Sequence, residues 1–126
     1  MAPSFDLKDK VIVVTGGSGG IGFATAELLV SEGAKVSISD VSEKGLAEAA
    51  AKIKGANHPG ELLTKQVDVR KSDQVDAWIK ETVKKFGKLD GAVNLAGVIP
   101  KTINIERVED LNNEDWNFTI DVNLNG

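Results

Sequence analysis

One glycine-rich segment, residues 15–22, has the composition of a ligand-binding turn and reads Thr-Gly-Gly-Ser-Gly-Gly-Ile-Gly. Gly16 can make a tight turn at the end of a strand, Gly20 can let the backbone approach a pyrophosphate, and Gly22 can let a helix pack closely on a sheet. A helix that begins here directs free N–H groups and a partial positive charge toward phosphates. The segment contains no Lys and does not end in Gly-Lys-Ser/Thr, so a nucleoside-triphosphate loop is disfavoured.

An acidic residue, Asp40, follows 18 residues after Gly22, at the end of the next apolar run. A carboxylate at this place can accept hydrogen bonds from both hydroxyls of an adenosine ribose, and it repels a 2′-phosphate. We expect a preference for NAD over NADP, because four neighbouring residues supply no cation for such a phosphate: Gly17, Ser18, Gly19 and Val41. The alternative is that Asp40 only leads into the following helix, whose N-cap is Ser42.

Alternating strand and helix patterns supply the frame that must position these residues. Short runs rich in Val, Ile and Leu predict strands at residues 11–14, 36–40, 62–67 and 91–95. Apolar positions at helical spacing predict helices over 21–32, after the N-cap Ser42, from just after Asp73 to Phe86, and after the N-cap Asn112. Strands that alternate with helices imply parallel pairing and right-handed crossovers. We expect an α/β fold, a Rossmann-type doubly wound parallel sheet of strand order 3-2-1-4, with ligands bound where this order reverses.

Large side chains on the helical faces indicate how these helices pack. Trp78 and Phe86 lie on one apolar stripe of the third predicted helix, and we expect both in the core. Trp116 begins a similar stripe with Ile120 and Leu124 in the last predicted helix. Core packing of that helix is the simplest interpretation, and contact of Trp116 with a cofactor or partner is the alternative.

Composition limits the classes of protein and partner that this chain can represent. Its 126 residues, 41% of them hydrophobic and 27% charged, suffice for one domain with a core. The net charge is −4 without a cluster of Lys and Arg, which argues against nucleic-acid binding. No apolar run reaches the roughly 18 residues of a spanning helix, so we expect no membrane association and a cytoplasmic location. We expect no metal site, because Cys is absent and the only His, His58, lies in a loop that should be solvated.

Five motifs occur in order along the chain: Thr-Gly-x-x-x-Gly-x-Gly at residues 15–22, the acidic Asp40, Asp68-Val69, Asn94-Leu95-Ala96-Gly97, and Asn123 within Asp121-Val122-Asn123-Leu124. With these motifs the chain resembles, from about Leu7 to Gly126, the short-chain dehydrogenase/reductase family. The resemblance implies that Asp68 contacts adenine, that Asn94 lies beside the nicotinamide-side ribose, and that Asn123 is a catalytic residue of a proton relay. It implies the following cofactor-binding residues: Thr15, Gly16, Ser18, Gly20, Ile21, Gly22, Asp40, Val41, Asp68, Val69, Asn94, Ala96 and Gly97.

The family's catalytic Ser and Tyr-x-x-x-Lys pair lie beyond the helix that carries Asn123, and this sequence contains no Tyr. In the family, that Tyr is the general acid/base for hydride transfer between NAD(H) and an alcohol or carbonyl substrate. We therefore expect residues 1–126 to form a dinucleotide-binding domain of such an oxidoreductase, incomplete at its C-terminus and without turnover alone. Its partners would be that small-molecule substrate and, through an uncovered sheet edge and helix face, further copies of itself as a homo-oligomer. A non-catalytic nucleotide-binding or interaction module is the alternative.

Overall fold

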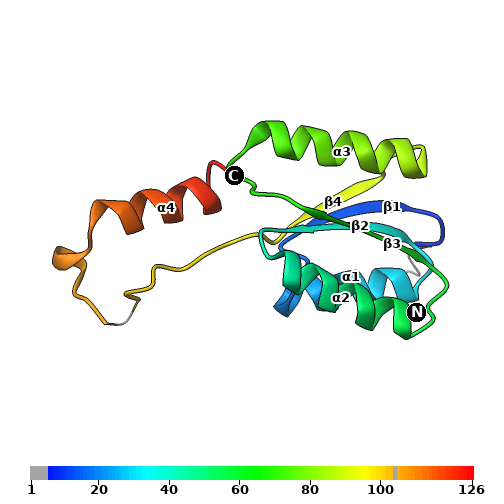
Figure 1. Ribbon diagram of the computed structural model, residues 1–126, viewed down its shortest axis with the longest axis horizontal. Coiled ribbons are helices and arrows are strands. Elements are labelled where there is room, and N and C mark those ends of the chain that lie inside the picture. The colour runs from blue at the N-terminus through cyan, green and yellow to red at the C-terminus, as the bar shows by residue number, and fades with distance from the viewer. Residues whose placement is uncertain (1–5, 104) are drawn as a thin grey trace.

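A parallel four-stranded sheet forms the centre of the protein (Figure 1). The computed structural model describes residues 6–103 and 105–126. The strands are β1 (Val11–Thr15), β2 (Lys35–Asp40), β3 (Glu61–Gln66) and β4 (Gly91–Asn94), and they lie in the order β3-β2-β1-β4. Every pairing is parallel. The predicted α/β fold and its strand order are confirmed, and the order reverses between β1 and β4.

Three helices cover the two faces of this sheet. α1 (Gly20–Ser31) and α2 (Glu43–Gly55) lie on one face, and α3 (Ser72–Phe86) lies on the other (Figure 1). A long segment leaves the end of β4 and leads through a short 3₁₀ helix, η1 (Val108–Asp110), to α4 (Asn113–Asn123). In Figure 1, α4 lies to one side of the three layers, and the C-terminus returns toward the start of α3.

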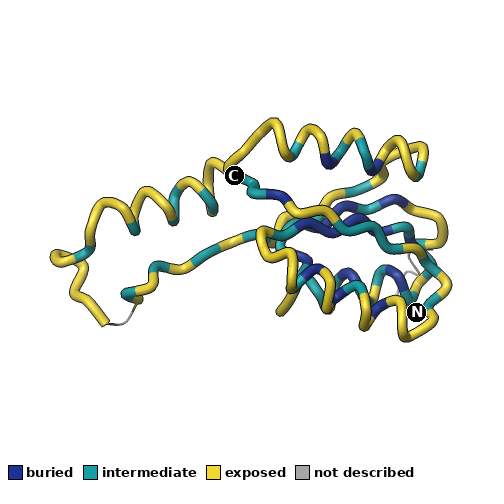
Figure 2. The backbone as a smooth tube through the Cα atoms, in the orientation of Figure 1, coloured by how far each residue is buried: buried dark blue, intermediate teal, exposed yellow. Residues whose placement is uncertain are grey.

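The core consists of two clusters, one on each face of the sheet, and Figure 2 shows the buried backbone gathered in the central strands. The larger cluster joins Val14 and Ile38 of the sheet to the α1 and α2 layer. The smaller cluster joins Val13 to Trp78 of α3. Helices on both faces explain why β1, in the middle of the sheet, is a continuous run of Val and Ile at residues 11–14.

A buried polar contact crosses the smaller cluster. Trp78 Nε1 donates to Ser37 Oγ at 2.7 Å, and Thr82 Oγ1 lies 3.0 Å from the same oxygen. Ser39 lies two residues further along β2, hence on the same face, and is only 1% exposed. Its Oγ has no hydrogen-bond partner in the part of the chain that the structure describes. Both serines are therefore buried on the same face of β2, but only the hydroxyl of Ser37 is hydrogen-bonded among the described residues.

The ends of the elements follow the sequence signals closely. Ser42 Oγ accepts from the Gly45 backbone N–H at 3.0 Å, and Asn112 Oδ1 accepts from that of Asp115 at 2.8 Å, so both predicted N-caps are confirmed. Gly87 follows α3 in the left-handed conformation, with φ of 84°. Each strand bound lies within one residue of the predicted bound, and α3 begins at Ser72, immediately before Asp73.

The expected core packing of the last helix is wrong. α4 forms as predicted, but it buries none of its residues, and Trp116 is 63% exposed. Phe86 of α3 is only half-buried, whereas Trp78 is fully buried as expected. The physical reason for the exposure of Trp116 is its distance from the sheet: the long segment after β4 carries α4 beyond the edge of the three layers (Figure 1).

Candidate functional site

The glycine-rich loop lies between β1 and α1, at the carboxyl edge of the sheet where the strand order reverses. Gly16 has φ of 67°, and a Cβ there would lie 2.9 Å from both Ala96 N and Leu95 O. A Cβ on Gly22 would collide with the Gly16 carbonyl group, whose carbon is 2.7 Å away. By contrast, a Cβ on Gly19 or Gly20 would meet nothing within 4 Å. The inner face of the loop is therefore packed, and its outer face is open.

Two adjoining hollows lie along this edge. The smaller, about 350 Å³, lies over the glycine-rich loop and is lined by Ser18, Gly19, Ile21, Gly22 and Asp40, among others. The larger, about 640 Å³, is of the size that holds small ligands. Apolar and polar residues both line it, and three of the lining residues are charged: Asp40, Asp68 and Arg70. Gly16, Asp40 and Gly97 line both hollows, which together could hold an extended ligand.

Asp40 lies where the two hollows meet, and its carboxylate joins two segments of backbone. Its Oδ2 accepts from the N–H of Ser18 in the glycine-rich loop, and its Oδ1 accepts from the N–H of Ser42, each at 3.2 Å. Asp40 thus does lead into α2, as the alternative has it, because it bonds to Ser42, the N-cap of that helix. Asp40 also lines both hollows, so its structural role does not remove the residue from the candidate site.

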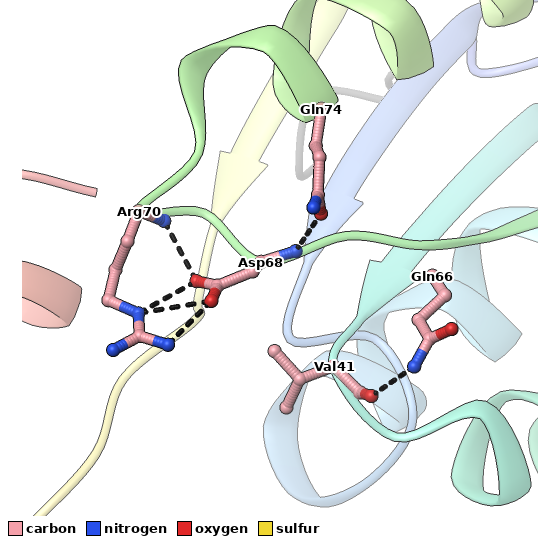
Figure 3. A network of polar contacts seen from close by, with 5 residues as sticks. All are labelled: Val41, Gln66, Asp68, Arg70 and Gln74. Atoms are coloured by element: carbon pink, nitrogen blue, oxygen red, sulfur yellow. Dashed lines mark hydrogen bonds and ion pairs between the residues drawn. The ribbon is translucent and has the colours of Figure 1, made fainter.

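Asp68 lines the larger hollow and belongs to a network of polar contacts (Figure 3). The Arg70 guanidinium donates hydrogen bonds to this carboxylate: Nε lies 2.9 Å from Oδ1, and Nη2 lies 2.6 Å from Oδ2. The backbone N–H of Asp68 donates to Gln74 Oε1 at 2.9 Å. The hydrogen bond from the Arg70 side chain is the main cause that holds the pKa of Asp68 below its usual value, so the carboxylate is ionised at neutral pH.

Two side chains fix the segment that follows β4. Thr15 Oγ1 accepts from the backbone N–H groups of Leu95 and Ala96, at 3.0 and 3.1 Å. Asn123 Oδ1 accepts from the N–H of Val98, and its Nδ2 donates to the carbonyl oxygen of Val98, both at 2.8 Å. Both polar atoms of the Asn123 side chain are therefore engaged with backbone.

The structure gathers most of the predicted site residues around the two hollows. The following residues line one or both of them: Gly16, Ser18, Ile21, Gly22, Asp40, Val41, Asp68, Val69, Ala96 and Gly97. Four predicted site residues line neither hollow: Thr15, Gly20, Asn94 and Asn123. Among the described residues, no group of three His, Asp or Glu side chains could hold a metal ion. No helix in those same residues is long and apolar enough to cross a membrane.

Sequence reasoning missed several residues of the larger hollow, namely Gln66, Arg70, Gln74 and Phe118. Arg70 had one available signal, because it lies two residues after Asp68 and could reach back to it. The interpretation of His58 as solvated also needs correction. His58 is half-buried, and its Nε2 is buried without a hydrogen-bond partner among the described residues.

Comparisons with known proteins identify what this arrangement is similar to. The sequence profile of a family described as short chain dehydrogenase matches residues 10–126. The short-chain dehydrogenase/reductase aba4 of Botryotinia fuckeliana is 44% identical over 118 residues, which cover 94% of this chain and 45% of that protein. The chain thus spans about half the length of the curated relatives that it matches.

Two solved structures that resemble this chain contain different nucleotides. NAD+-bound xylitol dehydrogenase has a TM-score of 0.86 and 28% identity, over 96% of this chain and 45% of that one. An actinorhodin polyketide ketoreductase with NADPH has a TM-score of 0.83 and 28% identity, over 92% of this chain and 42% of that one. The fold itself therefore accommodates either nucleotide.

Proposed function

The chain belongs to the short-chain dehydrogenase/reductase family, and from this premise we propose that it is the dinucleotide-binding part of an oxidoreductase that acts on alcohol or carbonyl substrates. A bound nicotinamide dinucleotide would supply the hydride donor or acceptor. The observation that carries the proposal is the placement of the open glycine-rich loop beside a hollow of about 640 Å³ at the reversal of strand order. Ligands of doubly wound sheets bind at this position.

The glycine-rich loop and the start of α1 fit the diphosphate of such a dinucleotide. At Gly19 and Gly20 the loop has no side chains and the space beside it is open, so phosphates could approach its backbone. α1 begins at Gly20, so its free N–H groups and partial positive charge favour a diphosphate there. The collision that a Cβ on Gly22 would cause with Gly16 explains why the loop and the helix need glycine to lie this close.

The adenosine half fits the larger hollow. Part of its wall, which includes Val41, Val69 and Val98, is apolar as the faces of an adenine ring require. The ionised carboxylate of Asp68 would accept a hydrogen bond from the adenine amino group. Asp40, between the two hollows, would accept from the ribose hydroxyls and repel a 2′-phosphate, so the proposal includes a preference for NAD over NADP.

Asn94 and Asn123 complete the proposed site at the nicotinamide end. Asn94 ends β4 beside the loop, where it would lie near the second ribose. Asn123 would act through its hold on Val98 rather than by touching substrate, because both of its polar atoms bond to that residue. Since the sequence contains no Tyr to serve as general acid/base, we propose dinucleotide binding without turnover by these 126 residues. Self-association is a further part of the proposal, supported by the exposed Trp116 and Phe118 of α4.

Isothermal titration calorimetry with NAD tests this function. We expect a saturable binding heat for the folded chain, and its absence at millimolar NAD would contradict the proposal. Gly19→Glu should abolish binding without unfolding the chain, because its φ of −163° suits any residue and its Cβ meets open space where the phosphates would lie. Gly55→Glu is the matched control: it adds the same charge at another open position, at the end of α2, and should leave binding unchanged.

A further inference from the structure

Arg70 has no role in the function proposed above, yet it makes four hydrogen bonds to Asp68 at the larger hollow (Figure 3). Its Nε donates to both oxygens of Asp68, at 2.9 and 3.1 Å, and its Nη2 donates to Oδ2 at 2.6 Å. Its own backbone N–H donates to Oδ1 at 3.0 Å. This forked arrangement fixes the plane of the carboxylate as well as its position.

The other end of the network fixes only the backbone of Asp68. Gln74 Oε1 accepts from the Asp68 N–H at 2.9 Å and does not touch the carboxylate. Loss of the Arg70 side chain would therefore leave the Asp68 backbone in place and hold the carboxylate by one bond only, from the backbone N–H of residue 70 to Oδ1. The structure thus separates the direction of the carboxylate, which depends on Arg70, from the position of the residue, which depends on Gln74.

Arg70 is itself held from the side of α4. Its guanidinium carbon lies 5.3 Å from the centre of the Phe118 ring, within the range of a cation–π contact. Asp121, also on α4, adds an electrostatic attraction that raises the pKa of Arg70, after the larger effect of Asp68. The side chain is partly exposed, at 39%, so its contacts are made at the rim of the hollow and not in the core.

We propose that Arg70 is a positioning residue that aims the Asp68 carboxylate at the amino group of adenine and thereby sets which purine the site accepts. This inference rests on the dinucleotide-binding function proposed above. An ionised carboxylate only accepts hydrogen bonds. If the carboxylate is held in one direction, it accepts a hydrogen bond from an amino group at position 6 of the purine and repels a carbonyl oxygen there. If it keeps only the bond from the backbone N–H of residue 70, the carboxylate can turn about that bond to avoid the oxygen, and the discrimination falls.

The test compares the affinity for NAD with that for nicotinamide hypoxanthine dinucleotide, which carries a carbonyl oxygen in place of the amino group. The wild-type chain should bind NAD about tenfold more tightly, as expected when a charged hydrogen bond is lost. Arg70→Ala should reduce this ratio to about threefold or less. Arg70→Lys should restore part of it, because Lys retains the charge but not the fork. Arg107→Ala is the control, since it breaks another pair of an Arg with a carboxylate two residues away, Glu109 at 3.1 Å, and should leave the ratio unchanged.

The measurements distinguish failure of this inference from failure of the proposed function. If Arg70 only stabilises the loop, Arg70→Ala will weaken both dinucleotides equally and leave their ratio unchanged, which would overturn the inference. Asp68→Asn supplies the second comparison, because an amide can donate to a carbonyl oxygen and should abolish the discrimination. If Asp68→Asn abolishes it and Arg70→Ala does not, the adenine site stands without the role of Arg70. If the wild-type chain binds neither dinucleotide, both the function and the inference are wrong.

Discussion

Asn123 and Val98 are joined by two hydrogen bonds, in which the side-chain amide of Asn123 pairs with the backbone N–H and carbonyl oxygen of Val98, each at 2.8 Å. An amide side chain here takes the place of a neighbouring strand, because it satisfies the donor and the acceptor of one residue together. These bonds tie the end of α4 to the segment after β4, which lines the larger hollow. The residue that the family resemblance assigns to catalysis thus has a clear structural task.

Asn123→Ala should release the backbone of Val98. We expect faster hydrogen exchange at the Val98 amide, while the amides of β1 and β2 keep their protection because α4 contributes nothing to their core. Asn123→Asp should retain the bond from the Val98 N–H and lose the bond to its carbonyl oxygen, so its exchange rate should fall between the other two. Equal rates in all three proteins would show that the pairing does not hold this segment in solution.

Ser37 and Ser39 form a matched pair for measuring the cost of a buried polar group. Ser37→Ala should lower the free energy of unfolding by about 1–3 kcal/mol, because it leaves the Nε1 of Trp78 buried without an acceptor. Ser39→Ala removes a hydroxyl that already has no partner in the described structure, so it should be neutral or stabilising. Urea denaturation of both variants measures the difference, and a loss as large for Ser39→Ala as for Ser37→Ala would contradict this account.

Gly22 and Gly19 lie on opposite faces of the glycine-rich loop and should respond differently to an added methyl group. Gly22→Ala pushes a Cβ into the Gly16 carbonyl group and should destabilise the fold by about 1–3 kcal/mol. Gly19→Ala meets open space in an extended conformation and should change stability by less than about 0.5 kcal/mol. Thermal or urea unfolding of the two variants gives the comparison, and similar losses would mean that the loop packs differently from the structure described here.

The fold could be predicted because its signals are local. A buried run such as residues 11–14, a cap such as Ser42, and an amphipathic stripe through Trp78 each need only a few neighbouring residues to be read. The rules for parallel crossovers then restrict the order of the strands. The placement of Asp40 beside the glycine-rich loop follows from the same logic, since consecutive parallel strands end at one edge of the sheet.

The features that the sequence does not predict depend on contacts between distant segments. The stripe through Trp116 correctly predicts a helix, but helical spacing does not say whether another surface lies against that stripe. The contact of Arg70 with Phe118 brings the loop after β3 against α4, and no spacing in the sequence encodes it. The pairing of Asn123 with Val98 is hidden for the same reason, because it depends on the path of the chain after β4.

Asp90 should contribute to the acid sensitivity of the fold. Its Oδ2 accepts from the Val11 backbone N–H at 2.8 Å and lies 2.9 Å from Lys88 Nζ, and the first of these contacts is the main cause that lowers the pKa of Asp90 below its ordinary 3.8. A lowered pKa in the folded state stabilises the fold above the unfolded pKa, and the contribution is lost as pH falls through the folded pKa. Asp90→Asn should therefore lose less stability than the wild type between neutral pH and about pH 2.5, measured as urea midpoints. Identical losses in both proteins would exclude this role for Asp90.

Asp40 accepts hydrogen bonds from two backbone N–H groups and lines both hollows, where we propose that it binds the ribose. Asp40→Ala should weaken NAD about tenfold through the loss of charged hydrogen bonds, and should weaken NADP less, because the repulsion of the 2′-phosphate disappears with the carboxylate. Asp40→Asn separates these effects. Its amide oxygen can still accept from the N–H of Ser18 or Ser42, so the loop should stay in place while the charge is gone. Calorimetric titration of each variant with both dinucleotides measures the ratio. If Asp40→Asn binds NAD and NADP in the wild-type ratio, the carboxylate serves the backbone alone, and the choice of nucleotide must arise elsewhere.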